Sequence, residues 1–506
     1  MYSVLEYLEE SAAAYPEKTA FEDMEEAVSF QELLRRAKRI GTALAGILPP
    51  GSPVPVFLPK SVKAVEVFLG AVYAGCFYSM LDRKQPAARL SSILDTLAAP
   101  CVVTDREGEQ QAIQQFGRSA LLYEELVGQE PDEALLGRIR AGHTDLEVLY
   151  VNFTSGSTGV PKGVAVSHRS VIDFIDCFVP LFQISSGDVI GNQAPFDFDV
   201  SVKDIYSTLK TGATMVIIPQ RFFSIPTQLL DLLCDRSVTT LIWAVSALTL
   251  VTRMHGFEYR IPEKVKRVIF SGEVMPAKQL KRWMEALPEA EFYNVYGPTE
   301  ITCNCTWYHV KHTDELPEDI PVGKPFPNEK VFLLDEEDHL VEQPGTVGEI
   351  CVGGTALSLG YYRNPEATAA AFVQNPLNSR YTETVYRTGD LAYYLESGDL
   401  VYAGRKDFQI KHMGHRIELL EIEQALNAVP EIEGACCLFL NEKITAVYSG
   451  NITRKEIIPI LKQRIPDYMV PNKFVQTETL PLNRNGKIDR RALEAFLDRR
   501  QREEKG

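Results

Sequence analysis

The order of apolar and polar residues predicts alternating helices and strands over the first two thirds of the chain. Residues 62–74 place apolar side chains with helical period, and residues 1–21 read as an amphipathic helix that carries acidic side chains. Residues 101–104, 146–153 and 214–218 are apolar runs of strand length bounded by turn residues. Helices that alternate with such strands favour a parallel sheet with crossover helices.

From residue 331 the pattern changes to short β-like segments between Gly, Pro and Asn turns, at residues 331–334, 347–352 and 400–402. The last hundred residues predict two helices and two strands, at residues 418–428, 453–463, 435–440 and 443–448.

We therefore predict an α/β protein with three parts. A large N-terminal domain at residues 1–403 holds mixed sheets with crossover helices and a small β-barrel-like portion. A hinge at residues 404–410 leads to a small α+β domain at residues 411–506, which is of ordinary domain size.

Composition narrows the function. The chain has 506 residues, 45% of them hydrophobic and 24% charged, as in ordinary globular proteins of more than one domain. Its net charge of −16 and the lack of clustered Lys or Arg exclude nucleic acid as a partner. Nine Cys without metal-ligand spacing predict a reduced, cytoplasmic location. No run of 18 apolar residues is present, so we expect no membrane partner.

A glycine-rich stretch at residues 153–164, FTSGSTGVPKGV, follows an apolar strand. Glycines let the backbone approach a ligand closely, while successive N–H groups, hydroxyls and a Lys can surround phosphate oxygens. The GxxxxGK[ST] spacing of a Walker A loop is absent. The alternative is a flexible linker, but linkers seldom follow a buried strand and end in Lys.

The stretch resembles the signature loop of the adenylate-forming superfamily, and further motifs resemble that family in the same order. They are NVYGPTE at residues 294–300, YRTGD at 386–390, GRKDFQIK at 404–411 and NRNGKIDR at 483–490. Taken singly, each later motif has an alternative interpretation as a polar turn, a charged linker or a solvated loop. Together they identify the chain as a member of the superfamily, with the fold above and a mobile C-terminal domain.

The resemblance implies an ATP site. Tyr296 would stack on adenine, Thr299 would contact the α-phosphate, Glu300 would ligate Mg²⁺ and Asp390 would accept the ribose hydroxyls. Lys487 would be the catalytic lysine, with Thr299 and Glu300 beside it. The complete set of implied ATP-binding residues is Thr154, Ser155, Gly156, Ser157, Thr158, Gly159, Lys162, Gly272, Glu273, Asn294, Tyr296, Gly297, Thr299, Asp390, Arg405 and Lys487.

By the same resemblance, Asp407 would be the hinge about which the small domain turns between two half-reactions. First, a carboxylate attacks the α-phosphate of Mg·ATP and releases pyrophosphate, with charge stabilised by Lys487 and Mg²⁺. Then a phosphopantetheine thiol accepts the acyl group. Residues 491–506 contain no serine, so we expect this thiol to lie on a carrier protein supplied in trans.

Within the superfamily, the sequence most resembles the amino-acid branch, which comprises nonribosomal peptide synthetase adenylation domains and D-alanine–carrier protein ligases. Asp199 falls on the position whose carboxylate meets the substrate ammonium, and a buried ammonium needs such a partner. By motif alignment with this family, the pocket would be lined by Asp199, Val200, Lys203, Trp243, Ile269, Ser271, Val295, Cys303 and Asn304.

Lys203 and Asn304 depart from the small apolar pocket that D-alanine requires. A buried ammonium without a counter-charge is costly, so we hypothesise a substrate with an acidic or strongly polar side chain. Lys203 could instead pair with Asp204, Asp197 or another acid, or extend outward into solvent. Two rival functions remain at this point: an acyl-CoA synthetase for a non-amino acid, and a nucleotide-binding module without catalysis.

Overall fold

The computed structural model describes residues 1–156, 160–312, 316–317, 319–481 and 488–503. Contacts divide the chain into two compact units. Unit 1 comprises Met1–Arg83, Leu94–Phe153 and Gly163–Lys406, and unit 2 comprises Lys84–Ile93, Thr154–Lys162 and Asp407–Gly506. Among the described residues, no helix is both long and apolar enough to cross a lipid bilayer.

Unit 1 contains a nine-stranded sheet, here called sheet A, in which six strands run parallel and the edges turn antiparallel. In spatial order its strands are β15 (Lys324–Pro325), β14 (Thr306–Val310), β13 (Glu291–Tyr296), β12 (Arg267–Ser271), β11 (Thr240–Ala244), β9 (Val189–Asn192), β10 (Thr214–Ile217), β1 (Thr19–Glu22) and β2 (Ala27–Ser29).

A second, six-stranded sheet, sheet B, has the order β6 (Ser119–Leu122), β5 (Cys101–Thr104), β3 (Pro53–Phe57), β4 (Phe77–Met80), β7 (Val148–Thr154) and β8 (Lys162–Ser167). Every residue of β3 is buried, as expected for a parallel strand covered on both faces. The apolar runs at residues 101–104, 146–153 and 214–218 are therefore strands as predicted, although they divide between two sheets.

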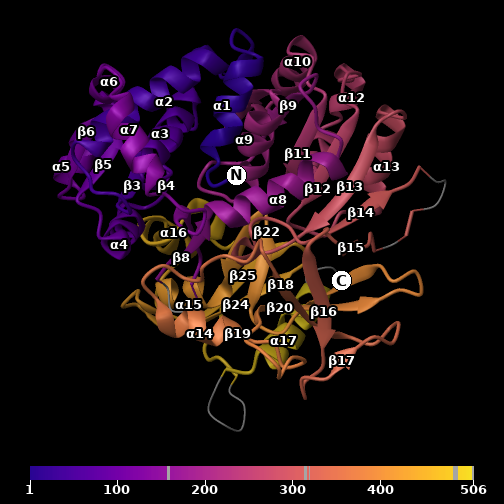
Figure 1. The fold of residues 1–506 in the computed structure, drawn as a ribbon. Helices are drawn as coiled ribbons and strands as arrows, with labels where there is room; N and C mark the ends of the chain where they lie inside the picture. Colours follow the sequence, from indigo (N-terminus) through magenta and orange to yellow (C-terminus); the bar gives the residue numbers. More distant parts are fainter. Residues whose placement is uncertain (157–159, 313–315, 318, 482–487, 504–506) are drawn as a thin grey trace. The chain divides into compact units, whose positions relative to one another are not determined.

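The helices of unit 1 are α1 (Leu5–Ala14), α2 (Phe30–Ala45), α3 (Val62–Tyr73), α5 (Arg106–Gln114), α6 (Tyr123–Leu126), α7 (Glu133–Ala141), α8 (His168–Leu181), α9 (Val200–Thr211), α10 (Pro226–Asp235), α11 (Val245–Arg253), α12 (Gly256–Tyr259), α13 (Ala277–Ala286) and α14 (Pro365–Ala371); α4 (Ala87–Leu97) crosses the boundary between the units. Short 3-10 helices are η1 (Gln220–Ser224) and η2 (Thr299–Ile301). Figure 1 shows the helices of unit 1 arranged beside its parallel strands.

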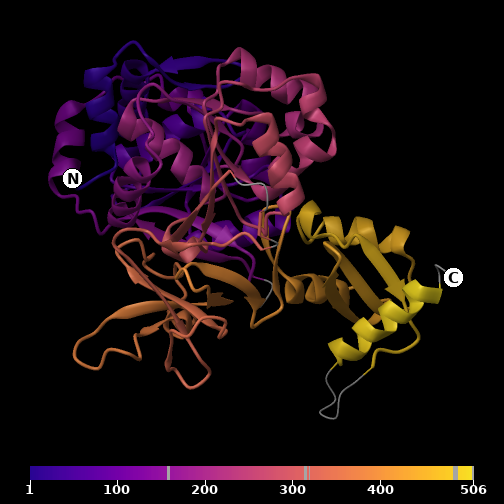
Figure 2. The same cartoon turned by 90° about the vertical axis from the view of Figure 1, so that its right-hand side faces the viewer.

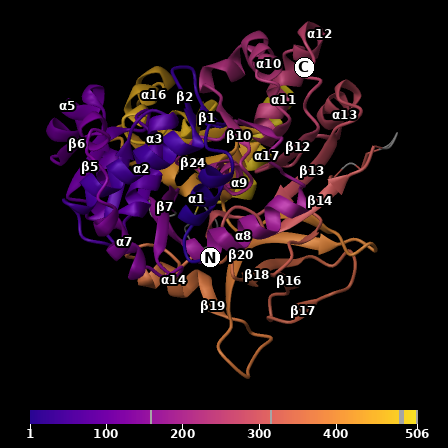
Figure 3. The same cartoon turned by 45° about the horizontal axis from the view of Figure 1, so that its top comes forward.

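Side chains along each strand of sheet A point alternately to its two faces, and each face contributes to a different hydrophobic core. Leu241, Val268 and Phe270 face a core shared with α10, α11 and α13, which lie beside β12 and β13 in Figure 3. Ile242 and Ile269 face the opposite way, into the core that contains α8, α9 and sheet B. Helix α9 contacts β9 and β10 of sheet A, and its Tyr206 hydroxyl lies 3.0 Å from the Tyr78 hydroxyl of sheet B. It therefore lies between the two sheets.

The remainder of unit 1 is an antiparallel sheet in the part for which the sequence predicted a small β-barrel-like portion. Its strands are β17 (Leu340–Val341), β16 (Glu329–Leu334), β18 (Gly348–Gly354), β20 (Thr384–Tyr394), β19 (Phe372–Gln374) and β21 (Leu400–Arg405). Together with sheets A and B, it confirms the predicted mixed α/β architecture.

Unit 2 contains a hairpin and a three-stranded sheet, whose strands and helices are visible in Figure 2. Its elements are β22 (Gln409–His412), β23 (His415–Glu418), α15 (Leu419–Asn427), β24 (Ile432–Leu440), β25 (Lys443–Gly450), α16 (Arg454–Lys462), η3 (Asp467–Met469), β26 (Lys473–Gln476) and α17 (Arg490–Glu503). Adjacent Cys436 and Cys437 point to opposite faces of β24, one toward α17 and the other toward α15 and α16.

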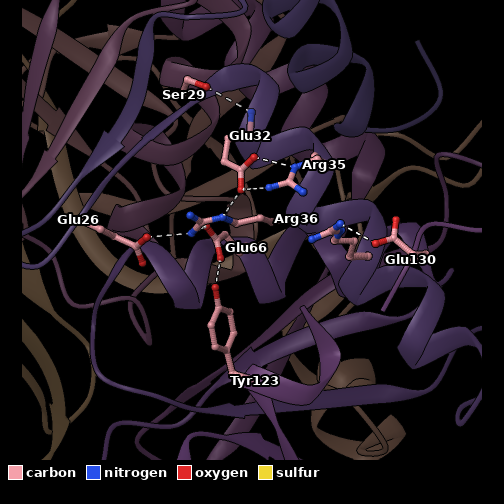
Figure 4. A network of polar contacts seen from close by, with 9 residues as sticks. Glu26, Ser29, Glu32, Arg35, Arg36, Glu66, Tyr123 and Glu130 are labelled. Atoms are coloured by element: carbon pink, nitrogen blue, oxygen red, sulfur yellow. Dashed lines mark hydrogen bonds and ion pairs between the residues drawn. The ribbon is translucent and has the colours of Figure 1, made fainter. Parts of the chain in front are cut away.

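A partly buried ionic network joins helices α2, α3 and α6 in the N-terminal region of unit 1 (Figure 4). Arg36 of α2 donates to Glu26, Glu32 and Glu66, and the Tyr123 hydroxyl donates to the other oxygen of Glu66. Three carboxylates therefore share one guanidinium, and the Glu66 side chain has no exposed surface. Burial raises the pKa of Glu66 to about 7, although Tyr123 and Arg36 act against this rise.

Glu66→Gln tests this network through the pH dependence of stability. A carboxyl group with a raised folded-state pKa stabilises the fold below pH 4.5 and loses that contribution as pH rises through 7. The wild type should therefore lose up to about 3 kcal/mol relative to Glu66→Gln between pH 4.5 and pH 8. Urea unfolding of both proteins across this range measures the difference, and a difference that stays constant with pH contradicts the assignment.

Candidate functional site

Residues predicted to bind the amino acid and the metal meet at the amino-terminal end of α9. Asp199 is the residue that precedes the helix, and only 9% of it is exposed. The Thr299 hydroxyl of η2 hydrogen-bonds its carboxylate, and neighbouring Glu300 is 1% exposed. Burial raises the pKa of Asp199, and repulsion from Glu300 adds to this rise, whereas Thr299 and Lys203 oppose it.

Two buried carboxylates that repel each other form a site that favours cations. An ammonium group beside Asp199 would relieve the repulsion, and so would a metal ion on Glu300. Mg²⁺ commonly binds through one or two carboxylates and completes its shell with substrate phosphates and water. The residues present therefore fit Mg²⁺ delivered with a nucleotide, and Glu300 remains the carboxylate predicted to hold it.

Lys203 lies on α9 and has no exposed surface, which rules out the alternative in which its ammonium extends into solvent. Its Nζ donates to the Asn304 Oδ1 at 2.8 Å, so the two residues that depart from a D-alanine pocket contact each other. Burial lowers the pKa of Lys203, while Cys303, Asp204 and Asp199 raise it. The described contacts pair the ammonium with a neutral amide, and the nearby acids act only through space.

Asp204, the next residue of α9, faces a different group. It accepts a hydrogen bond from the Asn192 amide at the end of β9, and burial raises its pKa to about 7 against the attraction of Lys203 and Lys60. Lys60 donates to the carbonyl oxygens of Asn192, Gln193 and Ile218, and burial lowers its pKa to about 7. Asp204 is therefore attracted by both Lys203 and Lys60, while its direct hydrogen bond comes from Asn192.

Three further predicted pocket residues, Ile269, Val295 and Cys303, belong to the same buried core as α9. Ser271 is buried at the end of β12, and Val200 is partly exposed in the first turn of α9. Trp243 does not join them. Its ring packs on Phe223 and Trp283 in the core on the opposite face of sheet A, and its Nε1 donates to the Gly191 carbonyl. Alternation along β11 accounts for this placement.

The turn between β13 and β14 is tightly packed. A Cβ at Gly297 would lie 2.5 Å from Asn304 Cα, so only glycine allows the turn to pass this close. Thr302 and Cys303 both adopt left-handed backbone angles, with φ of 53° and 76°. Such strain in two consecutive non-glycine residues is characteristic of functional sites. It brings the Cys303 thiol to within 2.9 Å of the Asp199 carbonyl oxygen.

The residues predicted to hold adenosine also meet within unit 1. Asp390 of β20 is fully buried; one carboxylate oxygen accepts from the Tyr296 hydroxyl at 2.5 Å and the other from Arg405 Nη1 at 2.7 Å. Asp390 and Arg405 are also direct partners across β20 and β21. The Asn294 amide donates to the Pro321 carbonyl, and Gly272 has a φ of +95° at the end of β12, before partly exposed Glu273.

Part of the predicted phosphate loop lies in unit 2. Thr154 ends β7, Lys162 begins β8, and the Ser155 hydroxyl donates to the Arg416 carbonyl at 2.8 Å. A Cβ at Gly156 would overlap the Val160 carbonyl oxygen, so the loop requires glycine there. The Asp407 carboxylate accepts from the Gln409 N–H at 3.1 Å. Ser157, Thr158, Gly159 and Lys487 lie outside the described residues.

The sequence analysis missed two tyrosines of this site. Tyr150 of β7 is fully buried and interacts electrostatically with Cys303, Asp199 and Tyr206; its hydroxyl has no hydrogen-bond partner among the described residues. Tyr361 donates from its hydroxyl to Glu300 Oε1 at 2.7 Å. Tyr150 lies within an apolar strand, and Tyr361 lies 61 residues from Glu300 in sequence. The one sequence signal for either residue was a polar hydroxyl among apolar neighbours.

Comparison with known proteins assigns the family. The AMP-binding enzyme family matches residues 8–362, and the AMP-binding enzyme C-terminal domain matches residues 421–487. The D-alanine–D-alanyl carrier protein ligase of Bacillus cereus (strain B4264) is 31% identical over 97% of this chain and 98% of that protein. The chain therefore belongs to the AMP-binding enzyme family.

Long peptide synthetases contain a region that is equally similar. Tyrocidine synthase 3 of Brevibacillus parabrevis is 33% identical over 96% of this chain, but the chain spans only 7% of that protein. Among solved structures, holo-PA1221, an NRPS protein that contains adenylation and PCP domains, has a TM-score of 0.83 and 25% identity over 97% of this chain and 84% of that one.

Gly297→Ala tests the turn that carries Glu300. Because the added methyl group would meet backbone atoms of Cys303 and Asn304, we expect a loss of about 1–3 kcal/mol in stability and weaker nucleotide binding. Melting temperature and titration with a fluorescent ATP analogue measure both. Gly137→Ala on α7, where a Cβ meets open space, is the matched control and should be neutral or stabilising. Equal behaviour of the two variants would contradict the packing argument.

Proposed function

We propose that the protein activates an amino acid with ATP as its aminoacyl-AMP, releases pyrophosphate, and transfers the aminoacyl group to the phosphopantetheine thiol of a carrier protein in trans. The observation that carries this proposal is the buried carboxylate of Asp199 at the start of α9, beside Thr299 and Glu300. A fatty or aryl acid would bring no ammonium group to that carboxylate, which would then rely on Thr299 and on the through-space charge of Lys203 to offset its burial.

The chemistry requires positioning and charge stabilisation. The substrate carboxylate is ionised at neutral pH, so its attack on the α-phosphate needs no general base. Mg²⁺ would supply charge neutralisation at the phosphates, and Glu300 would hold it. Thr299 would contact the α-phosphate, while Asp390 with Arg405 and Tyr296 would hold the adenosine. Lys487 would act as the catalytic cation, and rotation about Asp407 would separate the two half-reactions. A cytoplasmic location suits the reduced cysteines.

We further propose that the substrate side chain is acidic, or polar with a strong acceptor, and is bound by Lys203. Support comes from the burial of Lys203, from its pairing with the neutral Asn304 amide, and from the hydrogen bond of Asp204, which is to Asn192 and not to Lys203. A carboxylate on the substrate would provide the counter-charge that a buried ammonium requires. Asn304 would then orient the ammonium, and Tyr150 would offer a second donor.

Asp199→Asn distinguishes an amino acid from a non-amino acid substrate. The variant keeps the size of the side chain but removes the charge that an ammonium needs, so we expect kcat/KM in ATP–pyrophosphate exchange to fall about 10- to 100-fold for the preferred amino acid. Exchange with the deamino analogue of the same acid should be unaffected. Exchange that wild type supports with fatty or aryl acids but with no amino acid would favour an acyl-CoA synthetase.

Lys203→Met tests the side-chain assignment. A substrate panel should show the wild type preferring amino acids with carboxylate or amide side chains, with kcat/KM for them reduced about 100-fold in the variant and activity toward neutral amino acids gained. Lys210→Met, on the same helix but ion-paired with Asp176 at the surface, is the control and should keep wild-type preference. A wild type that prefers alanine, together with an unchanged Lys203→Met, would refute the assignment.

A further inference from the structure

The segment that follows β18 joins two parts of unit 1 that are distant in sequence. On one side it bonds to the turn that carries Glu300: the Ser358 N–H donates to the Glu300 carbonyl at 2.9 Å, and the Thr302 hydroxyl donates to the Ala356 carbonyl at 2.7 Å. The backbone and the hydroxyl of this turn are therefore both held by the same segment.

On the other side the segment pairs with β8, the strand that follows the predicted phosphate loop in sequence. The Ala165 N–H donates to the Gly360 carbonyl at 2.9 Å, and the Tyr362 N–H donates to the Gly163 carbonyl at 2.7 Å. Tyr361 and Val164 form an antiparallel bridge between these two bonds. The backbone of Tyr361 is thus anchored to a strand of sheet B.

The side chain of Tyr361 reaches from this anchor to the carboxylate. Its hydroxyl donates to Glu300 Oε1 at 2.7 Å, and the two residues are 8% and 1% exposed. The ring packs edge-on against Phe372 at 5.9 Å, and the Tyr361 N–H donates to the Thr368 hydroxyl at 2.9 Å. Backbone and ring are both constrained, so the hydroxyl can approach Glu300 from only one direction.

A hydrogen bond at one oxygen restricts rotation of a carboxylate and determines where the other oxygen points. Neighbouring Asp199 does not perform this task, because its interaction with Glu300 is repulsive.

We propose that Tyr361 is a positioning residue for the metal-binding carboxylate: its hydroxyl orients Glu300 and couples that orientation to strand β8. The inference rests on the proposed function in one respect, the role of Glu300 as the Mg²⁺ ligand. Tyr361 acts through Glu300, so its loss should weaken metal binding while leaving amino-acid binding intact.

Tyr361→Phe provides the test, because it removes the hydroxyl and keeps the ring on Phe372. Mn²⁺ binding in the presence of a non-hydrolysable ATP analogue, followed by electron paramagnetic resonance, should weaken about tenfold to a hundredfold. In ATP–pyrophosphate exchange the Mg²⁺ concentration for half-maximal rate should rise by a similar factor. At saturating Mg²⁺ most of kcat should return, and KM for the amino acid should not change.

Tyr362→Phe is the matched control. Tyr362 is adjacent, its backbone pairs with the same strand, and its ring packs on Phe77, so this variant should retain wild-type metal affinity. Melting temperatures of both variants show whether either substitution disturbs folding.

Glu300→Gln separates failure of this inference from failure of the proposed function. If Glu300→Gln weakens Mn²⁺ binding and Tyr361→Phe does not, Tyr361 is not a positioning residue and the proposed function stands. If neither variant weakens it, Glu300 is not the metal ligand, and both the inference and the assigned role of Glu300 are refuted. A kcat loss in Tyr361→Phe that added Mg²⁺ does not restore would also overturn the inference.

Discussion

Helix α9 places three ionisable side chains in the interior of unit 1, between two sheets, and the site is arranged around the need to stabilise them. Asp199, Lys203 and Asp204 are each at most 9% exposed. Buried charge is tolerated only where hydrogen bonds and opposite charges compensate for the lost hydration. Each of the three has a different compensation: the Thr299 hydroxyl, the Asn304 amide, and the Asn192 amide with Lys60 nearby.

This constraint connects the helix to the strained turn after β13. The turn supplies Thr299, Glu300, Cys303 and Asn304 within six residues, and it can do so because Gly297 permits close packing and because Thr302 and Cys303 adopt left-handed angles. The segment after β18 then holds the turn in place through Ser358, Ala356 and Tyr361. Strain in the turn is thus compensated by hydrogen bonds from a different part of the chain.

The residues predicted to hold adenosine are brought together by a different kind of geometry. Asp390 and Arg405 are partners across two antiparallel strands, and Tyr296 reaches Asp390 from the end of a sheet A strand. Three motifs that are spread over about a hundred residues therefore converge on one carboxylate. Local sequence indicates each motif as a polar turn, but only strand pairing brings their side chains within hydrogen-bond distance.

Local pattern was sufficient for most elements, because apolar period reports burial directly: residues 101–104 form β5 and residues 62–74 form α3 nearly as predicted. It was also sufficient to identify the adenylate-forming family, because the motifs have fixed composition and order. Local pattern could not assign the strands to two sheets. It also could not show that Trp243 lies on the face of sheet A opposite α9, because the face toward which a side chain points depends on how its strand is placed in the sheet. Nor could it reveal the contacts of Lys203 with Asn304 and of Tyr361 with Glu300. These join residues that are 101 and 61 positions apart, and such contacts exist only once the tertiary structure has brought their elements together.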